Sequence, residues 1–131
     1  LPILYKNPND FNAAKAIIEQ PDTGSLCTFI PAKTHPYNCW SFDEKNRALS
    51  QYIPNKTFRR QDKPPAWELY HYVCCFKASV LPSLNNELLS RDTHPILMDE
   101  EASENLIEVD TPEDFERWKA WRRSRRESET P

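Results

Sequence analysis

The stretch I-E-V-D-T-P-E-D-F, residues 107–115, is the part of the sequence that decides the fold. It predicts a short strand over residues 106–109 that turns at once into a helix. Thr111 can cap this helix, Pro112 suits its first position, and the two acidic residues that follow suit a first turn whose exposed N–H groups favour negative charge. The helix is expected to reach about Arg123.

Two carboxylates lie where this strand is expected to end. Glu108 and Asp110 are two residues apart, so both point to one face of an extended strand. Open α/β sheets bind ligands at the carboxyl ends of their strands, and oxygen ligands suit Mg²⁺. The pair is therefore a candidate magnesium site. The alternative is a well-capped helix whose acidic residues are only solvated.

Length and composition favour a single domain. The chain has 131 residues and a net charge of −3, which gives no indication of a nucleic-acid partner. No apolar run approaches the roughly 18 residues of a membrane span, and no signal segment is recognisable, so no membrane partner is expected. The first residue is Leu1 rather than Met, and we interpret the chain as a fragment or a processed product.

The cysteine and glycine residues limit which metal sites, disulfides and phosphate-binding loops this chain can form. Cys74 and Cys75 are adjacent, so on a strand they face opposite sides and cannot share a metal ion. Cys27 and Cys39 are isolated, and no C-x-x-C or Cys/His metal-binding spacing occurs. Buried reduced thiols are favoured over a disulfide framework, which indicates a cytosolic protein. With Gly24 as the single glycine, this chain cannot form a P-loop or a dinucleotide-binding loop.

The remaining elements follow from hydrophobic periodicity and turn signals. A helix is expected from about residue 9 to residue 20, between strands at residues 1–5 and 25–30, which together would form a right-handed βαβ unit. Residues 68–80, the longest apolar stretch, predict the central strand. Further predictions are a short helix within residues 81–89, a strand at 94–98 and an acidic loop at 99–101.

The three histidines are scattered along the sequence. No Ser or Cys accompanies them at a spacing typical of a nucleophilic triad. His35 and His94 each precede a proline, which favours extended or turn backbone. Structural roles are therefore expected for these two and for His71.

Residues 31–65 are rich in proline and aromatic residues. Within them, residues 40–42 and 49–53 predict a hairpin that is joined by the polar turn 43–46. Such a hairpin has little sheet of its own with which to bury aromatic side chains. They are expected to pack either on a partner surface or back on their own domain.

Two motifs resemble the acylneuraminate cytidylyltransferase family. R-R-Q-D-K-P-P, residues 59–65, resembles the family's R-R-Q-D-x-P segment, and residues 107–115 resemble its I-D-x-D-T-P-E-D-F motif. Their order and their spacing of about 45 residues also fit the family. The resemblance extends from about Asp10 to Trp118.

The resemblance implies a Rossmann-like three-layer α/β nucleotidyltransferase fold and a homodimer formed through an arm, here residues 35–65. It implies transfer of CMP from CTP to a sialic-type sugar acid in the cytoplasm, with release of pyrophosphate and the help of Mg²⁺. The implied site residues are Glu108 and Asp110 for the metal, and Arg59, Arg60 and Gln61 for the substrate. Guanidinium groups suit an anionic sugar acid, although these arginines could instead pair with Asp62 or with residues 99–101.

Departures from the family pattern limit what the chain can do alone. The CTP-binding half, with its basic glycine-containing loop, is missing, so the chain is interpreted as the C-terminal part and is expected not to turn over CTP. Tyr70 and His71 replace the usual Asn-Gly, and Glu108 replaces the usual Asp. Two alternatives stay open: a non-catalytic dimerisation or interaction module that keeps the scaffold, and a related nucleotidyltransferase for another sugar.

Overall fold

The computed structural model describes residues 3–128, and the remaining terminal residues lie outside the described part. Within it the chain forms a small mixed α/β fold, in which a three-stranded sheet is accompanied by a separate two-stranded hairpin. The α-helices and strands, in chain order, are α1 (Pro8–Ile18), β1 (Ser25–Pro31), β2 (Trp40–Asp43), β3 (Ala48–Gln51), β4 (Trp67–Phe76), β5 (His94–Leu97), α2 (Glu100–Glu104) and α3 (Pro112–Ser128). Three 3₁₀ turns complete it: η1 (Pro36–Asn38), η2 (Arg60–Asp62) and η3 (Ala78–Ser83).

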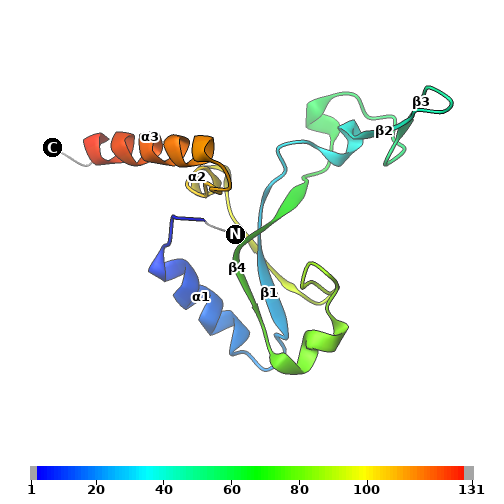
Figure 1. The fold of residues 1–131 in the computed structure, drawn as a ribbon. Coiled ribbons are helices and arrows are strands. Elements are labelled where there is room, and N and C mark those ends of the chain that lie inside the picture. The colour runs from blue at the N-terminus through cyan, green and yellow to red at the C-terminus, as the bar shows by residue number, and fades with distance from the viewer. Residues whose placement is uncertain (1–2, 129–131) are drawn as a thin grey trace.

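Strand β1 is the centre of the three-stranded sheet, whose order is β4-β1-β5 (Figure 1). It pairs antiparallel with β4 and parallel with β5. Four successive residues of β1, residues 25–28, are buried, because this strand has a neighbour on each edge and is covered on both faces. The prediction that residues 68–80 form the central strand was therefore wrong, since β4 covers residues 67–76 and lies at one side of β1.

Helix α1 forms as its sequence predicts and packs on one face of this sheet. Asn7 caps it by accepting a hydrogen bond from the Asn9 N–H (3.1 Å), and Pro8 occupies its first position. Ala14 faces the sheet. The core that α1 covers consists of Ile3, Ala14, Leu26, Ile30, Tyr72, Val73 and Leu106, all nearly or fully buried. Burial of each large apolar side chain stabilises the fold by about 1.5–3 kcal/mol.

The predicted βαβ unit does not form. Of the described residues that precede α1, Ile3 makes an isolated antiparallel bridge to Glu108 and does not pair with β1. The parallel partner of β1 is β5 instead, with Phe29 opposite Leu97. Both edges of β1 are taken by β4 and β5, which leaves no edge for the N-terminal segment.

Three local predictions were also wrong. Residues 81–89 do not form a helix: η3 ends at Ser83, and Leu88 has a φ of 59°, which a helix does not allow. Residues 99–101 are the N-cap and first turn of α2, because Asp99 accepts a hydrogen bond from the Ala102 N–H (2.7 Å). Residues 106–109 contribute only the bridge of Glu108 and no strand.

The hairpin β2–β3 and helix α3 both project from the sheet, to opposite sides (Figure 1). The turn of the hairpin is held by Asp43, whose carboxylate accepts hydrogen bonds from the N–H groups of Lys45 and Asn46. Helix α3 runs to Ser128, five residues beyond the predicted end. No helix within residues 3–128 is long and apolar enough to cross a membrane.

Candidate functional site

The predicted metal ligands Glu108 and Asp110 lie in the connection between the Ile3 bridge and α3. Glu108 is half-buried and Asp110 is exposed. No hydrogen bond or ion pair within the described residues engages either carboxylate. Both groups are therefore available to a ligand, although they extend from an irregular connection and not from the end of a sheet strand.

The start of α3 fixes this connection through a reciprocal capping box. The Thr111 hydroxyl accepts a hydrogen bond from the Asp114 N–H (3.1 Å), and Asp114 Oδ2 accepts one from the Thr111 N–H (3.1 Å) and one from the Asp110 N–H (3.3 Å). The Thr111 hydroxyl also donates to Asp114 Oδ2 (2.8 Å), and this bond is the main reason why the pKa of Asp114 lies below its ordinary value. Asp114 is thus occupied by the helix and by Arg117, which lies 3.0 Å from its other oxygen.

Both carboxylates line a cavity of about 200 Å³, whose lining residues are Lys33, Tyr70, Leu106, Glu108, Asp110, Asp114 and Arg117. Tyr70 closes its inner side, where its hydroxyl donates to the Leu106 carbonyl (2.7 Å). Burial, followed by the nearby Glu108 carboxylate, raises the pKa of Tyr70 to about 12. The cavity therefore combines the carboxylates of Glu108 and Asp110 with the cationic side chains of Lys33 and Arg117 and the neutral phenol of Tyr70.

Lys33 connects this cavity with two larger ones towards the hairpin. A cavity of about 540 Å³ is lined by Lys33, Arg60 and Arg117 among others, and one of about 600 Å³ by Lys33, His35 and Arg60. We call the surface formed by Lys33, Arg60, Glu108, Asp110 and Arg117 the mixed-charge groove. The three cavities share Lys33, and Glu100 and Glu104 line the 540 Å³ cavity beside the arginines, so the groove offers both anion-binding and cation-binding side chains.

The structure brings one of the three predicted substrate residues to the groove. Arg60 lines it, whereas Gln61 lies exposed on η2 and Arg59, over the ring of Phe58 (5.9 Å), lines none of the three cavities. Within the described residues, no ion pair joins either arginine to Asp62 or to residues 99–101.

Two cationic residues of the groove and one cluster of metal-ligating residues were not predicted from the sequence. Lys33 and Arg117 are ordinary surface residues in sequence, and only the fold brings them beside Glu108 and Asp110. Three metal-ligating side chains come together at one place in the described part of the chain, but this group is Cys27, His71 and Cys74, not the acidic pair. No spacing in the sequence indicates this cluster, because a regular strand would place His71 and Cys74 on opposite faces.

His35 has the structural role expected from the sequence, whereas of the four cysteines, which were expected to be buried, only Cys27 is buried and Cys39, Cys74 and Cys75 are half-buried. His35 accepts a hydrogen bond from the Tyr37 N–H through Nδ1 (3.1 Å) and contacts the Pro64 carbonyl through Nε2 (2.9 Å), so it ties together the base of the hairpin arm. All four thiols are free. Neither a scan against protein-family models nor a search of curated proteins gives a match to this chain.

Proposed function

We propose that the chain is the C-terminal part of a cytoplasmic nucleotidyltransferase that transfers CMP from CTP to a sialic-type sugar acid. In this reaction a sugar hydroxyl oxygen bonds to the α-phosphorus, the α–β anhydride bond breaks, and pyrophosphate leaves. The observation that carries the proposal is that Glu108 and Asp110 open onto the same groove as Lys33, Arg60 and Arg117. The proposed complete fold is the Rossmann-like three-layer domain, to which this chain contributes its sheet and arm.

The acidic pair fits Mg²⁺. This ion is commonly held by one or two carboxylates, with substrate phosphates and water completing its octahedral shell. Glu108 and Asp110 are two such ligands, and neither is engaged by another side chain of the described residues. When bound, Mg²⁺ supplies neutralisation of the phosphate charge and orientation of the α-phosphate.

The cationic residues fit the anionic substrate. Arg60 and Arg117 both line the 540 Å³ cavity, and a guanidinium binds a carboxylate or phosphate through two parallel hydrogen bonds. Lys33 adds a point charge between the two cavities. These groups would bind and orient the sugar acid, which is the main requirement of a phosphoryl-type transfer.

Arg59 and Gln61 have a role in this proposal only in a homodimer. They lie on the arm of residues 35–65, outside the groove of their own chain. In a homodimer joined through this arm, they act on the groove of the second copy. Tyr70, which lines the 200 Å³ cavity where the family pattern has the smaller Asn, would restrict the size of the sugar acid.

The proposal is tested by calorimetric titration of the purified chain with N-acetylneuraminic acid, with and without Mg²⁺. We expect binding that Mg²⁺ strengthens, and a loss of roughly 10–100-fold in affinity for Arg60→Ala. The double variant Glu108→Gln/Asp110→Asn should abolish the effect of Mg²⁺, whereas Glu44→Gln, which removes an exposed charge from the hairpin turn, should not. Absence of any Mg²⁺-dependent binding of sugar acid would contradict the proposal.

A second candidate is a non-catalytic dimerisation module, which the exposed aromatic side chains of the arm favour. Trp40, Phe42 and Tyr52 are each at least half exposed, and Phe58 is 86% exposed. Such a module would dimerise and show neither sugar-acid binding nor any response to Mg²⁺. The same titration therefore separates the two functions.

A further inference from the structure

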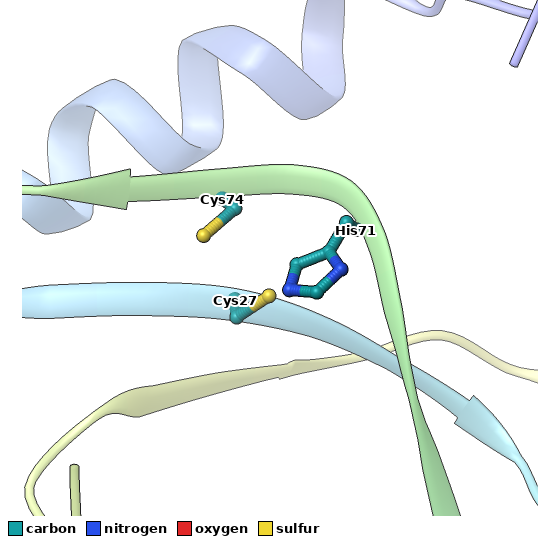
Figure 2. Close-up of side chains that lie close together, drawn as sticks. All are labelled: Cys27, His71 and Cys74. Carbon is teal, nitrogen blue, oxygen red and sulfur yellow. The ribbon is translucent and has the colours of Figure 1, made fainter. Parts of the chain in front are cut away.

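A compact group of soft metal ligands lies on the sheet face opposite α1. Cys27 of β1 and Cys74 of β4 are directly opposite each other in the antiparallel pair, and the His71 ring lies against them with a nitrogen towards the Cys27 sulfur (Figure 2). One ligand atom from each residue lies within 4.8 Å of the other two. None of the three lines the mixed-charge groove, so the cluster is independent of the function proposed above.

A bulge in β4 creates the cluster. On a regular strand His71 and Cys74, three residues apart, would point to opposite faces. The register shifts, however, because Cys27 pairs with Cys74 and Phe29 pairs with Leu69, so two steps along β1 correspond to five along β4. Bulges re-aim side chains, and this one turns His71 to the face that carries both thiols.

The bulge is held in place by Thr28, which faces the extra residues of β4. Its hydroxyl accepts a hydrogen bond from the Val73 N–H and donates one to the Val73 carbonyl, both at 3.1 Å. Because Thr28 and Val73 are buried, these bonds satisfy backbone groups that water cannot reach. The ligand geometry therefore does not depend on a bound ion.

A loop also contacts His71 Nε2, the ring nitrogen that faces the Cys27 sulfur (Figure 2). His71 Nε2 donates to the Glu87 carbonyl (3.2 Å). The Asn85 side chain closes this loop by accepting hydrogen bonds from the Glu87 N–H (2.9 Å) and the Leu89 N–H (3.0 Å). A metal ion at Nε2 would take the place of this hydrogen bond, since the nitrogen must lose its proton before it can bind the ion.

We infer that Cys27, His71 and Cys74 bind a zinc ion, with water in the fourth coordination position. Two thiolates and one imidazole are a nitrogen–sulfur ligand set that Zn²⁺ prefers and that Mg²⁺ and Ca²⁺ do not. Cys27 is fully buried, whereas His71 and Cys74 are half-buried, which leaves one side open to an exchangeable ligand. On binding, both thiols lose their protons to solvent and no electron is transferred.

The site would also join β1 to β4 at the bulge. An ion bound by the folded chain and not by the unfolded chain stabilises the fold by an amount that grows with the logarithm of its concentration relative to its dissociation constant, and so raises the melting temperature. The zinc ion would therefore act on the stability of the sheet that positions both the groove and the arm.

The test uses the reduced chain, freed of metal by a chelator and titrated with Co²⁺ and then Zn²⁺. We expect one equivalent of Co²⁺ to give a thiolate-to-metal charge-transfer band and the intense visible bands of tetrahedral coordination, both displaced by Zn²⁺. Loss of a ligand should weaken binding by more than about 100-fold, because changes to groups that only orient a ligand already cost about 10–100-fold. This loss is expected for Cys74→Ser and His71→Gln.

Cys75→Ser is the matched control, because Cys75 neighbours Cys74 on β4 but packs against the core on the other face. It should retain full Co²⁺ affinity, and circular dichroism of each variant verifies that it is folded. Three results would overturn the inference: no charge-transfer band in the wild-type chain, an equal loss for Cys75→Ser, or a Cys27–Cys74 disulfide in chain purified under reducing conditions. Cys27 is fully buried, so the variant Cys27→Ser could fail to fold. The test therefore uses substitutions of the two half-buried ligands, His71 and Cys74.

Discussion

Tyr72 connects α1 to the sheet through a single hydroxyl group. The hydroxyl accepts a hydrogen bond from the Asn7 N–H (2.9 Å) and donates one to Asp10 Oδ2 (3.0 Å). Its ring, only 4% exposed, lies edge-on to Phe11 with 5.6 Å between ring centroids. One residue of β4 thus fixes the N-terminal end of the helix and part of the core.

Tyr72→Phe is therefore expected to lower the free energy of unfolding by about 1–2 kcal/mol, because it removes both hydrogen bonds and keeps the ring. Urea denaturation measures this change. Tyr52→Phe is the control, since Tyr52 is 70% exposed on the hairpin arm and should leave stability unchanged. Equal stability of Tyr72→Phe and the wild-type chain would show that the hydroxyl does not hold the helix.

The same hydroxyl predicts a loss of stability at high pH. Burial raises the pKa of Tyr72 to about 12 from an ordinary value of 10.0, against the opposing effect of the Asn7 N–H. Because the folded chain holds this proton more tightly than the unfolded chain does, the stabilisation is complete below pH 10.0 and is lost as pH rises towards 12. Urea denaturation across this range should show a smaller decline for Tyr72→Phe than for the wild-type chain.

At the scale of elements, local signals in the sequence were sufficient wherever an element is stabilised by its own residues. The helix starts expected near residue 9 and at Thr111, the hairpin turn at residues 43–46 and the short apolar run at residues 25–30 each predicted the correct type of element. The strand predicted at residues 106–109 is not formed, because the only pairing of this segment within the described residues is the isolated bridge of Glu108 to Ile3.

The cluster of Cys27, His71 and Cys74 also could not be predicted from the local sequence of β4. Strand periodicity places His71 and Cys74 on opposite faces, and only the bulge brings them together. The bulge depends on contact between β4 and the Thr28 hydroxyl of another strand. No spacing rule within β4 could have revealed it.

Thr28→Val tests whether this hydroxyl holds the bulge. The substitution keeps the shape of the side chain but leaves the buried N–H and carbonyl of Val73 without their partner, so we expect a loss of about 2–4 kcal/mol in the free energy of unfolding. Chemical denaturation measures it. Thr34→Val, at an exposed position after β1, should cost far less. A similar small cost for both variants would show that the bulge forms without Thr28.

The start of α3 predicts a transition at acid pH. The hydrogen bond from Thr111 holds the pKa of Asp114 below its ordinary value of 3.8, so the folded chain binds this proton more weakly than the unfolded chain does. The stabilisation is complete above pH 3.8 and is lost as pH falls through the lower folded value. Far-ultraviolet circular dichroism should show loss of helix in this range.

Asp114→Asn should remove this part of the acid transition, since the amide oxygen still accepts hydrogen bonds but does not titrate. Glu113→Gln, in the same helical turn, should keep the transition. An unchanged acid transition in Asp114→Asn would show that another group is responsible.

At the scale of the whole molecule, the groove is lined by residues from the end of β1, the base of the hairpin arm and α3. The sequence motifs predicted three of its five residues, Arg60, Glu108 and Asp110, because each belongs to a short local pattern. Lys33 and Arg117 come from segments far apart in sequence. Their proximity is a property of the fold, which explains why motif reasoning missed them.

The hairpin arm is the part of the molecule with the clearest need for a partner. Phe42 and Leu49 are opposite each other in the β2–β3 pair, and Trp40, two residues from Phe42, shares their face. All three are at least half exposed, so this face has no cover within the described part of the chain. The apolar face therefore fits the arm-mediated homodimer of the proposed enzyme better than it fits a solvated loop.

Sedimentation of the chain over a range of concentrations tests this dimer. Phe42→Ser/Leu49→Ser should weaken self-association by about tenfold or more, because buried apolar contacts at the centre of an interface carry most of its binding energy. Ala48→Ser, on the opposite face of the hairpin, should leave the dissociation constant unchanged. A wild-type chain that stays monomeric at every concentration would contradict the homodimer, and since Arg59 and Gln61 then could not reach a second groove, it would also remove their proposed role in substrate binding.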